Sequence, residues 1–292
     1  MTVSFVGVLL VVGSALAYST LDLVRKLLVA RISGATLLVY LSIGQLPFFA
    51  GWMMLAGSGA VDRGYALPAA ASIVLNIAAN LLFMEAVRLS PLSLTIPFLA
   101  LTPVFTTLLG VPLLGEVPRP VQWVGIAVVV LGAFRLNAGR GPGDGRWGWG
   151  SLVAERGSLL MVFVALSWSL AMPLDKIALG LADAPTHGLV LNAGVGVGLF
   201  AVLLVRGRVS EVRALGQSLG LMAVAVSVSV FGLAFLLMAL GYLWVAVAET
   251  LRRAIGSIAA LLLGRLIFEE PITSAKVAGV ALMTLGVAMI LL

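Results

Sequence analysis

The chain has 292 residues, of which 61% are hydrophobic and only 10% are Asp, Glu, Lys or Arg. A soluble domain is about one quarter charged residues, so this composition excludes a water-soluble globular protein and predicts a chain embedded in lipid. The lack of cysteine excludes disulfides and thiolate chemistry, and the formal net charge of +6 fits anchoring to anionic lipid better than binding to nucleic acid.

Ten apolar stretches are long enough to cross the membrane as helices, each of which takes about 20 residues. Their continuous apolar runs exclude the alternating pattern of a membrane barrel, so we predict an all-α integral membrane protein. The predicted helices cover 3–24, 35–56, 67–88, 92–113, 119–138, 157–177, 185–205, 217–240, 243–267 and 272–292. The first stretch imitates a secretory signal, but it has no positive leader, and we interpret it as a retained helix.

The two halves of the chain resemble each other at a nearly constant offset. Ala15–Ser19 matches Ala165–Ser169 at an offset of 150, and Gly125 matches Gly279 at an offset of 154. Five helices per copy is an odd number, so the two copies cross the membrane in opposite directions, as the inverted repeats of secondary transporters do. We predict two inverted five-helix repeats around a central cavity, divided as repeat 1–138, glycine-rich linker 139–156 and repeat 157–292.

The fourth helix of each half carries the most specific sequence pattern. Ser90–Glu116 reads SPLSLTIPFLALTPVFTTLLGVPLLGE, and its counterpart is Leu251–Pro271, followed by a last helix with spaced glycines. These segments resemble the EamA family of the drug/metabolite transporter superfamily, and the resemblance extends over nearly the whole chain as two copies. It implies ten helices, a central cavity lined by helices 1, 3, 4, 6, 8 and 9, cytoplasmic termini, and transport of small metabolites, often amino acids. It does not identify the solute.

Glycine spacing indicates where helices approach each other closely. Gly194 and Gly198 form a small-xxx-small pair in an apolar span, a pattern that lets a second helix come near. Gly125 and Gly132 lie two turns apart on one helix face, as do the matching glycines at 279 and 286. We interpret these positions as packing contacts, with the fifth and tenth helices serving as a scaffold or a dimer surface.

Prolines interrupt the fourth predicted helix. Pro91, Pro97 and Pro103 each remove a backbone donor, and in lipid such breaks are tolerated where a neighbour or a watery cavity satisfies the freed carbonyl. Thr95 adds a hydroxyl next to these breaks. The pattern fits either a bent packing helix or a hinge beside the solute, and we place Thr95 and Pro97 in the predicted solute site.

A charged cluster lies inside the ninth predicted helix. Glu249 stands three residues before Arg252 and four before Arg253, spacings that suit ion pairs on one helix. A charge at that depth costs about 2.5–3.5 kcal/mol on insertion scales, so it is retained where it faces a cavity or a partner. Arginines that reach the membrane surface from a shifted helix boundary are the alternative. We favour a role in solute binding or gating, in which the arginines hold a carboxylate.

Polar and aromatic residues on three other helices complete the predicted solute site. Asn76 and Asn80 share one face of the third helix, where they serve either as links between helices or as the wall of a polar cavity. Matching positions of the first and sixth helices carry an aromatic ring followed by a serine, Tyr18-Ser19 and Trp168-Ser169. Aromatic belts at the membrane surface account for many such rings. A matched pair that clamps the solute is the alternative.

Charged residues lie at the related ends of the first and sixth helices, and Lys26 matches Lys176 at the offset of 150. These residues are Asp22 and Lys26 in the first half, and Asp175 and Lys176 in the second. They fit either anchoring at the membrane surface or ion pairs that gate the cavity. His187, the only histidine, falls in a predicted connection, and one histidine makes neither a metal site nor a relay, so we assign it no role. No catalytic, metal or nucleotide-binding motif is present, and we expect no enzyme activity and no cofactor.

Together these features favour a secondary transporter in the cell (inner) membrane that moves a small metabolite, an amino acid or similar zwitterion by preference, by alternating access. A channel or passive pore for small solutes is the alternative. The predicted partners are the solute, a proton or a counter-solute, and membrane lipid, with the chain as a monomer or a homodimer. Thirteen basic residues lie at connections on one face of the membrane and three on the other, which places the termini outside. The resemblance implies cytoplasmic termini, so the sequence leaves orientation open.

Overall fold

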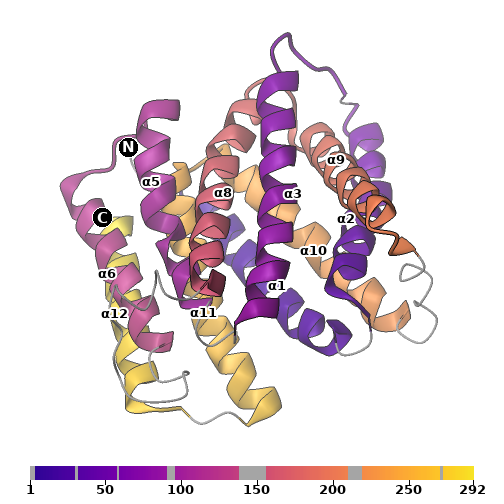
Figure 1. Cartoon of the computed structure of the whole chain (residues 1–292). Coiled ribbons are helices and arrows are strands. Elements are labelled where there is room, and N and C mark those ends of the chain that lie inside the picture. The colour runs from indigo at the N-terminus through magenta and orange to yellow at the C-terminus, as the bar shows by residue number, and fades with distance from the viewer. Residues whose placement is uncertain are drawn as a thin grey trace.

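The computed structural model of the chain describes residues 4–29, 32–57, 59–90, 96–137, 156–209, 219–269 and 272–292. These residues form ten α-helices and one short 3-10 helix (Figure 1). Their bounds are α1 Phe5–Val29, α2 Gly34–Leu55, α3 Ala66–Leu89, η1 Ile96–Leu101, α5 Thr102–Leu114, α6 Pro120–Asn137, α8 Arg156–Leu179, α9 Ala184–Val205, α10 Leu219–Leu240, α11 Val245–Phe268 and α12 Ser274–Leu291. Each predicted span coincides with one helix, except that the fourth is divided into η1 and α5.

The lengths and compositions of these helices confirm a protein that crosses the membrane many times. Seven of the described helices are long and apolar enough to span a bilayer, and shorter apolar stretches cover Phe98–Leu114 and Pro120–Arg135. The remaining helix is α11, which contains Glu249, Arg252 and Arg253. The predicted linker lies outside the described residues, apart from Arg156 at the start of α8.

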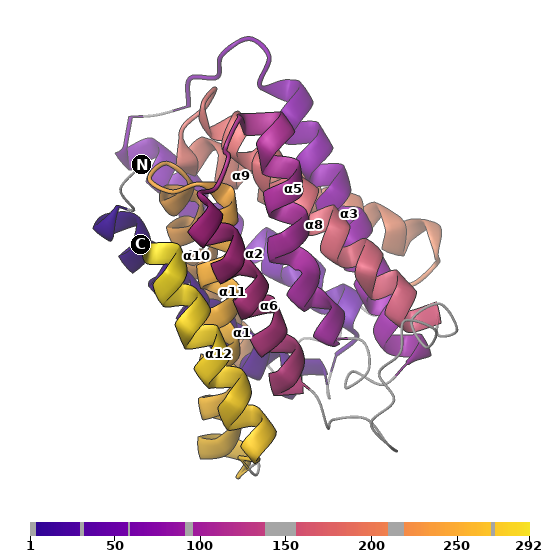
Figure 2. The ribbon, with the colours of Figure 1, turned by 90° about the vertical axis from the view of Figure 1, so that its left-hand side faces the viewer.

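The pattern of helix packing stays the same when each helix is replaced by its counterpart in the other half (Figures 1 and 2). The exchange relates α1 to α8, α2 to α9, α3 to α10, α5 to α11 and α6 to α12. Helix α6 packs on α12 and α2 packs on α9, so each of these helices meets its own counterpart. Helix α3 packs on α8 as α10 packs on α1, and α1 packs on α11 as α8 packs on α5. This pairing is the one that two repeats related by a twofold axis require.

The α6–α12 contact shows that the two copies run in opposite directions. A Cβ atom at Gly125 would lie 2.8 Å from the Gly286 carbonyl oxygen, and one at Gly132 would lie 2.8 Å from the Gly279 carbonyl oxygen. The earlier glycine of α6 meets the later glycine of α12, so the two helices are antiparallel. The predicted packing role of these glycines is confirmed, and their faces cover each other within one chain.

Other elements of the fold also repeat between the halves. The α5 helix ends at Gly115 with φ 67, and Glu269 follows α11 with φ 54, so both helices end in the left-handed conformation. The two positions differ by 154, the same offset as the glycines of α6 and α12. Gly194 and Gly198 of α9 face Ile73 and Ile77 of α3, which confirms that this small-xxx-small pair lets a helix approach closely.

Candidate solute site

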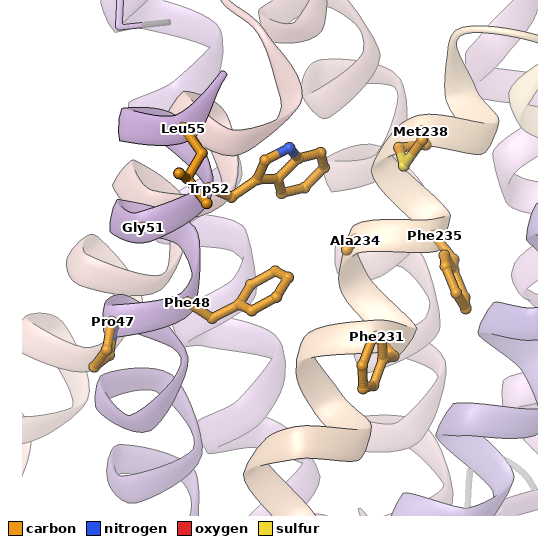
Figure 3. A pocket seen from close by; sticks show the side chains of 9 residues that line it. All are labelled: Pro47, Phe48, Gly51, Trp52, Leu55, Phe231, Ala234, Phe235 and Met238. Atoms are coloured by element: carbon orange, nitrogen blue, oxygen red, sulfur yellow. The ribbon is translucent and has the colours of Figure 1, made fainter. Parts of the chain in front are cut away.

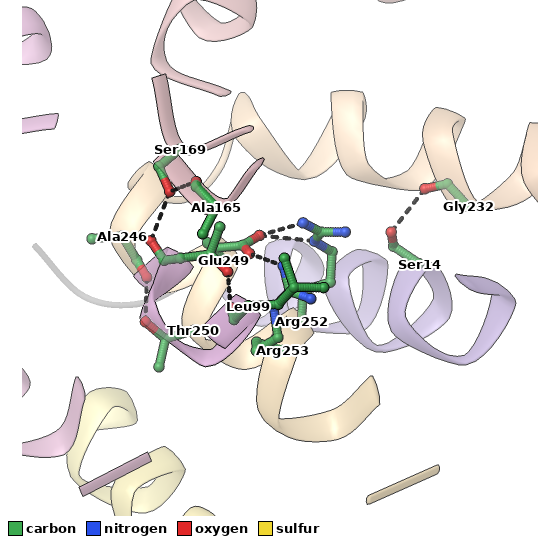
Figure 4. A network of polar contacts seen from close by, with 11 residues as sticks. Ser14, Leu99, Ala165, Ser169, Gly232, Ala246, Glu249, Thr250, Arg252 and Arg253 are labelled. Atoms are coloured by element: carbon green, nitrogen blue, oxygen red, sulfur yellow. Dashed lines mark hydrogen bonds and ion pairs between the residues drawn. The ribbon is translucent and has the colours of Figure 1, made fainter. Parts of the chain in front are cut away.

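The centre of the charged cluster is the buried carboxylate of Glu249 on α11 (Figure 4). Arg252 donates to one of its oxygens through Nε at 3.0 Å and through NH2 at 2.5 Å. Arg253 donates to the other oxygen through NH2 at 2.9 Å. The ion pairs predicted from the i,i+3 and i,i+4 spacings are therefore present. Because one carboxylate serves two guanidinium groups, the cluster has one positive charge in excess.

The side chains that carry the two guanidinium groups are more exposed than the Glu249 side chain. The Glu249 side chain is 1% exposed, whereas the side chains of Arg252 and Arg253 are each 22% exposed. The Nε atom of Arg253 is buried and has no hydrogen-bond partner among the described residues. The carboxylate thus lies inside the protein and orients two cations that retain unused donors. Such a site attracts an anionic group.

The ring of Tyr18 on α1 covers one side of this cluster. The Arg252 guanidinium carbon lies 5.5 Å from the ring centroid, a distance at which a cation and an aromatic face attract each other. The next residue, Ser19, donates to the Gly256 carbonyl of α11 at 2.9 Å. Tyr18 and Ser19 therefore lie beside the cluster, where they join α1 to α11 next to Arg252. Their role in solute binding stays a prediction.

The matched positions in the other half carry no charge. At the offset of 154, Arg252 and Arg253 correspond to Phe98 and Leu99 of η1, which are buried in an apolar cluster. The Trp168 ring packs against Phe83 with centroids 6.1 Å apart. The Trp168 ring therefore lies in an apolar environment that is the counterpart of the charged cluster, while Ser169 donates to the Thr102 carbonyl as Ser19 does to the Gly256 carbonyl. Apart from these serines, the repeat symmetry of the fold does not extend to the chemistry of the site.

The remaining predicted solute-site residues are spread along the fold. Asn76 and Asn80 use their amide groups within α3, where they donate to the Ser72 carbonyl at 3.0 Å and the Asn76 carbonyl at 2.8 Å. None of these bonds links two helices. Pro97 lies in η1 and Thr95 lies outside the described residues.

Lys176 forms an ion pair whose partner, Glu116, was not predicted from the sequence. Its Nζ atom lies 2.6 Å from a carboxylate oxygen of Glu116, which follows α5, and 2.6 Å from the Leu243 carbonyl oxygen before α11. The second Glu116 oxygen accepts from the backbone N–H of Val245, the first residue of α11, at 2.7 Å. Glu116 therefore caps α11 and holds the end of α8 against it. The two partners lie 60 positions apart, and no spacing in the sequence pairs them.

The charged residues at the other predicted gate make fewer contacts. Asp22 pairs with Arg25 at 3.3 Å on the same helix, and its side chain is 67% exposed. The Lys26 side chain lies outside the described part of the structure. Glu85 and Arg88 form a similar exposed pair at 3.6 Å.

The prediction that His187 lies in a connection was wrong. This residue lies within α9, fully buried, and not in a connection. Its Nε2 atom is 3.2 Å from a carboxylate oxygen of Asp175 and its Nδ1 atom is 3.0 Å from the Tyr65 hydroxyl. Ser72 of α3 donates to the same Asp175 oxygen. A single histidine is uninformative in a sequence, because its partners here stand 12 and 122 positions away.

An apolar groove of about 440 Å³ lies between α2 and α10 (Figure 3). Its lining consists of Pro47, Phe48, Gly51, Trp52, Leu55, Phe231, Ala234, Phe235 and Met238. The rings of Phe48 and Trp52 extend from α2 toward α10 (Figure 3). No charged side chain lines the groove, so it suits hydrocarbon and cannot pair with a charged group of a solute.

Comparison with known proteins agrees with this architecture. A family model described as the EamA-like transporter family matches residues 5–138 and again residues 155–292. The chain belongs to the EamA-like transporter family. A solved structure described as "Crystal structure of protein" is similar in fold, with a TM-score of 0.69 and 18% sequence identity, over 97% of this chain and 95% of that chain. No curated protein matches the chain.

Membership of the EamA-like transporter family makes the chain a multi-pass membrane transporter of the drug/metabolite superfamily, whose cargo is a small solute. The family match agrees with the twofold pairing of the described helices. In this chain the charged cluster lies in the second half only, and the matching positions of the first half are apolar.

Proposed function

We propose that this chain is a secondary transporter of the cell (inner) membrane that carries a small metabolite with a carboxylate group, an amino acid by preference, by alternating access. The observation that supports the proposal most directly is the excess positive charge of the Glu249 cluster. Placing a guanidinium group within a bilayer costs free energy, so such a group is retained where it has a charged partner or a function. Arg252 and Arg253 share one partner, and a solute carboxylate would supply the second.

The cluster also suits a ligand that binds and leaves. Glu249 holds both arginines in place before the solute arrives, so little side-chain entropy is lost on binding. The planar fork of a guanidinium group matches the two oxygens of a carboxylate. The Tyr18 ring, which lies over Arg252, offers an apolar surface beside the charged group. An amino acid presents a carboxylate and a side chain in that arrangement.

The Lys176–Glu116 pair is the proposed gate on the face where both termini lie. It joins α8 to the start of α11, the helix that carries Glu249, and so closes the approach to the cluster from that face. Pro173 interrupts α8 three residues before Lys176 and removes the backbone hydrogen bond to the Ser169 carbonyl. The end of α8 can therefore tilt while Ser169 stays bonded to α5. Opening of this pair would expose the cluster to the terminal face.

Uptake by proteoliposomes tests the proposal. The purified chain is reconstituted, and entry of each of the common amino acids is measured with and without a gradient of that amino acid. Saturable uptake that is accelerated by unlabelled amino acid on the opposite side supports a carrier. Unsaturable flow without such counterflow, or no uptake across the panel, would contradict it.

Substitution of Arg252 links the activity to the cluster. Arg252→Ala leaves Glu249 with Arg253 as a neutral pair, so the protein should accumulate and fold as the wild type does while transport is lost. Arg88→Ala, which breaks the exposed pair with Glu85, is the matched control and should transport normally. Equal transport by both variants would remove the cluster from the solute path.

A further inference from the structure

The buried polar group that the solute site leaves unused is centred on Asp175 and His187. These two residues come from α8 and α9, and their side chains are 13% and 0% exposed. Ser72 of α3 donates to the carboxylate oxygen of Asp175 that also faces the His187 ring, and Tyr65, which precedes α3, bonds the other ring nitrogen. Three helices from both halves thus meet at one pair of titratable groups within a membrane protein.

We propose that Asp175 and His187 form a protonation site that exchanges one proton in each transport cycle, and this inference rests on the proposed carrier function because it names the coupling ion. The carboxylate and the neutral imidazole together carry one negative charge. Binding of one proton, on the imidazole nitrogen or on the carboxylate oxygen, makes the pair neutral.

The charged groups near Asp175 and His187 interact with other partners and do not balance the charge of this pair. Lys176, the next residue of α8, points to Glu116, and its charge is matched there. Asp183 caps the start of α9 by accepting from a backbone N–H, and Tyr65 contributes a neutral hydroxyl. The nearest charges of α11 are the Glu249 cluster. Helices α2, α5 and α10 contribute no acidic or basic side chain, and the remaining charged residues of α3 and α8 lie at their opposite ends.

The site is placed where a proton can influence the gate. Asp175 and Lys176 are consecutive on α8, and they hold the end of that helix in two directions. Asp175 ties it to α3 and α9, and Lys176 ties it to α11. Both lie beyond Pro173, on the part of α8 that can tilt. Protonation of the Asp175 carboxylate weakens its hold on its donors, so it frees the same segment that must move to open the gate.

Infrared titration of the purified protein tests the site without any transport measurement. The wild-type spectrum minus the Asp175→Asn spectrum should contain the carbonyl stretch of one protonated carboxyl or the bands of a protonated imidazole at low pH, and should lose them as pH rises. The same difference taken between Asp62→Asn, a change on an exposed residue of the same face, and the double variant Asp62→Asn/Asp175→Asn should contain the same bands. A difference spectrum without any such pH-dependent band would overturn the proposal.

Two further variants cover the case in which Asp175→Asn does not fold. His187→Gln keeps a polar side chain of similar size, and Tyr65→Phe removes only the hydroxyl that bonds the ring. Either variant should shift the midpoint of the infrared transition relative to the wild type. An unchanged midpoint in both would overturn the proposal.

Transport then separates the proton site from the carrier function. With any amino acid that the wild type carries, Asp175→Asn should keep solute-for-solute exchange and lose accumulation driven by a pH gradient, down to the level of wild-type vesicles without a gradient. Accumulation equal to that of the wild type would contradict the proton site and leave the carrier intact. If the wild type carries nothing in the panel, the carrier proposal fails and the infrared titration still decides the protonation site.

Discussion

Ser19 and Ser169 make the same two hydrogen bonds from equivalent positions of the two repeats. Ser19 donates to the Ala15 carbonyl at 2.8 Å on its own helix and to the Gly256 carbonyl of α11 at 2.9 Å. Ser169 lies 2.6 Å from the Ala165 carbonyl on its own helix and 3.1 Å from the Thr102 carbonyl of α5. Each serine therefore joins the first helix of one repeat to the fourth helix of the other, and the two links hold the halves together.

Loss of either serine link should cost the protein a similar small amount of stability. Hydrogen bonds between membrane helices contribute about 0.6 kcal/mol on average. We expect Ser19→Ala and Ser169→Ala each to destabilise by about that amount, and the double variant by the sum, because the sites do not touch. Unfolding of the purified protein in detergent with a denaturant measures this. A large loss of stability for one serine variant alone would show that the two hydrogen-bonded links do not contribute equally.

The glycine contact between α6 and α12 should tolerate no added methyl group. A Cβ atom at Gly132 would lie 2.8 Å from the backbone nitrogen of Met283 and equally close to the Gly279 carbonyl oxygen, and backbone cannot move aside cheaply. We expect Gly132→Ala to destabilise by about 1–3 kcal/mol, the usual cost of overpacking. Gly51 of α2 is the matched control, since a Cβ atom there meets nothing within 4 Å. Gly51→Ala should be neutral or stabilise by up to about 1 kcal/mol, and equal effects would contradict the packing.

How much of this fold could be predicted depends on how each feature is encoded. The offset of 154 pairs Gly125 with Gly279 and so indicates the repeat, because small residues and their spacing are visible in a single sequence. The odd number of helices per copy then indicates that the copies are inverted. The Glu249 cluster was also predictable, because its three members lie within five consecutive residues of one helix. Contacts within a helix follow from its periodicity.

Contacts between distant helices could not be predicted in this way. Lys176 meets Glu116 across 60 positions, and nothing in either residue type selects the other among the charged residues of the chain. The same is true of Tyr65 and His187. The fourth helix is divided between Leu101 and Thr102, just before Pro103, one of the prolines that the sequence gives as breaks. Whether this break lies beside the solute stays a prediction.

The carboxylate of Glu249 should matter more for folding than either arginine. Glu249→Gln leaves two partly buried guanidinium groups with no counter-charge, and the cost approaches the roughly 3–5 kcal/mol of breaking a fully buried ion pair. We expect poor accumulation in the membrane and early unfolding in detergent. Adding Arg253→Gln should restore much of the stability, because one charge is then removed as well. A double variant no more stable than Glu249→Gln alone would show that the charge balance is not the cause.

Release of Lys176 should open the face on which the termini lie. The chain contains no cysteine, so a single one can be introduced as a reporter without other changes. Ala248 of α11 is fully buried and precedes Glu249. In an Ala248→Cys background, Lys176→Ala should increase the rate of labelling by a water-soluble maleimide, measured in detergent by mass shift. Arg88→Ala in the same background should leave the rate unchanged, and equal rates in all three proteins would exclude the gate.

Alkaline titration provides a separate check on the environment of Tyr65. Burial, followed by the negative charges of Asp175 and Asp183, raises the pKa of this phenol from 10.0 to about 12. Because the folded protein holds the proton more tightly than the unfolded chain, the contribution of Tyr65 to stability is complete below pH 10. It decreases between pH 10 and about 12 as the unfolded state releases its proton. Tyr65→Phe has no proton to release, so its unfolding free energy should fall less steeply across that interval.

The informative quantity is the difference between the two unfolding curves measured at a series of pH values. Lysines and the other tyrosines titrate in both proteins and cancel in the difference. We expect the stability of the wild type relative to Tyr65→Phe to be constant below pH 10 and to decrease steadily above it. Parallel curves up to pH 12 would mean that the phenol meets water freely, and the hydrogen bond to His187 would then have no support from solution measurements.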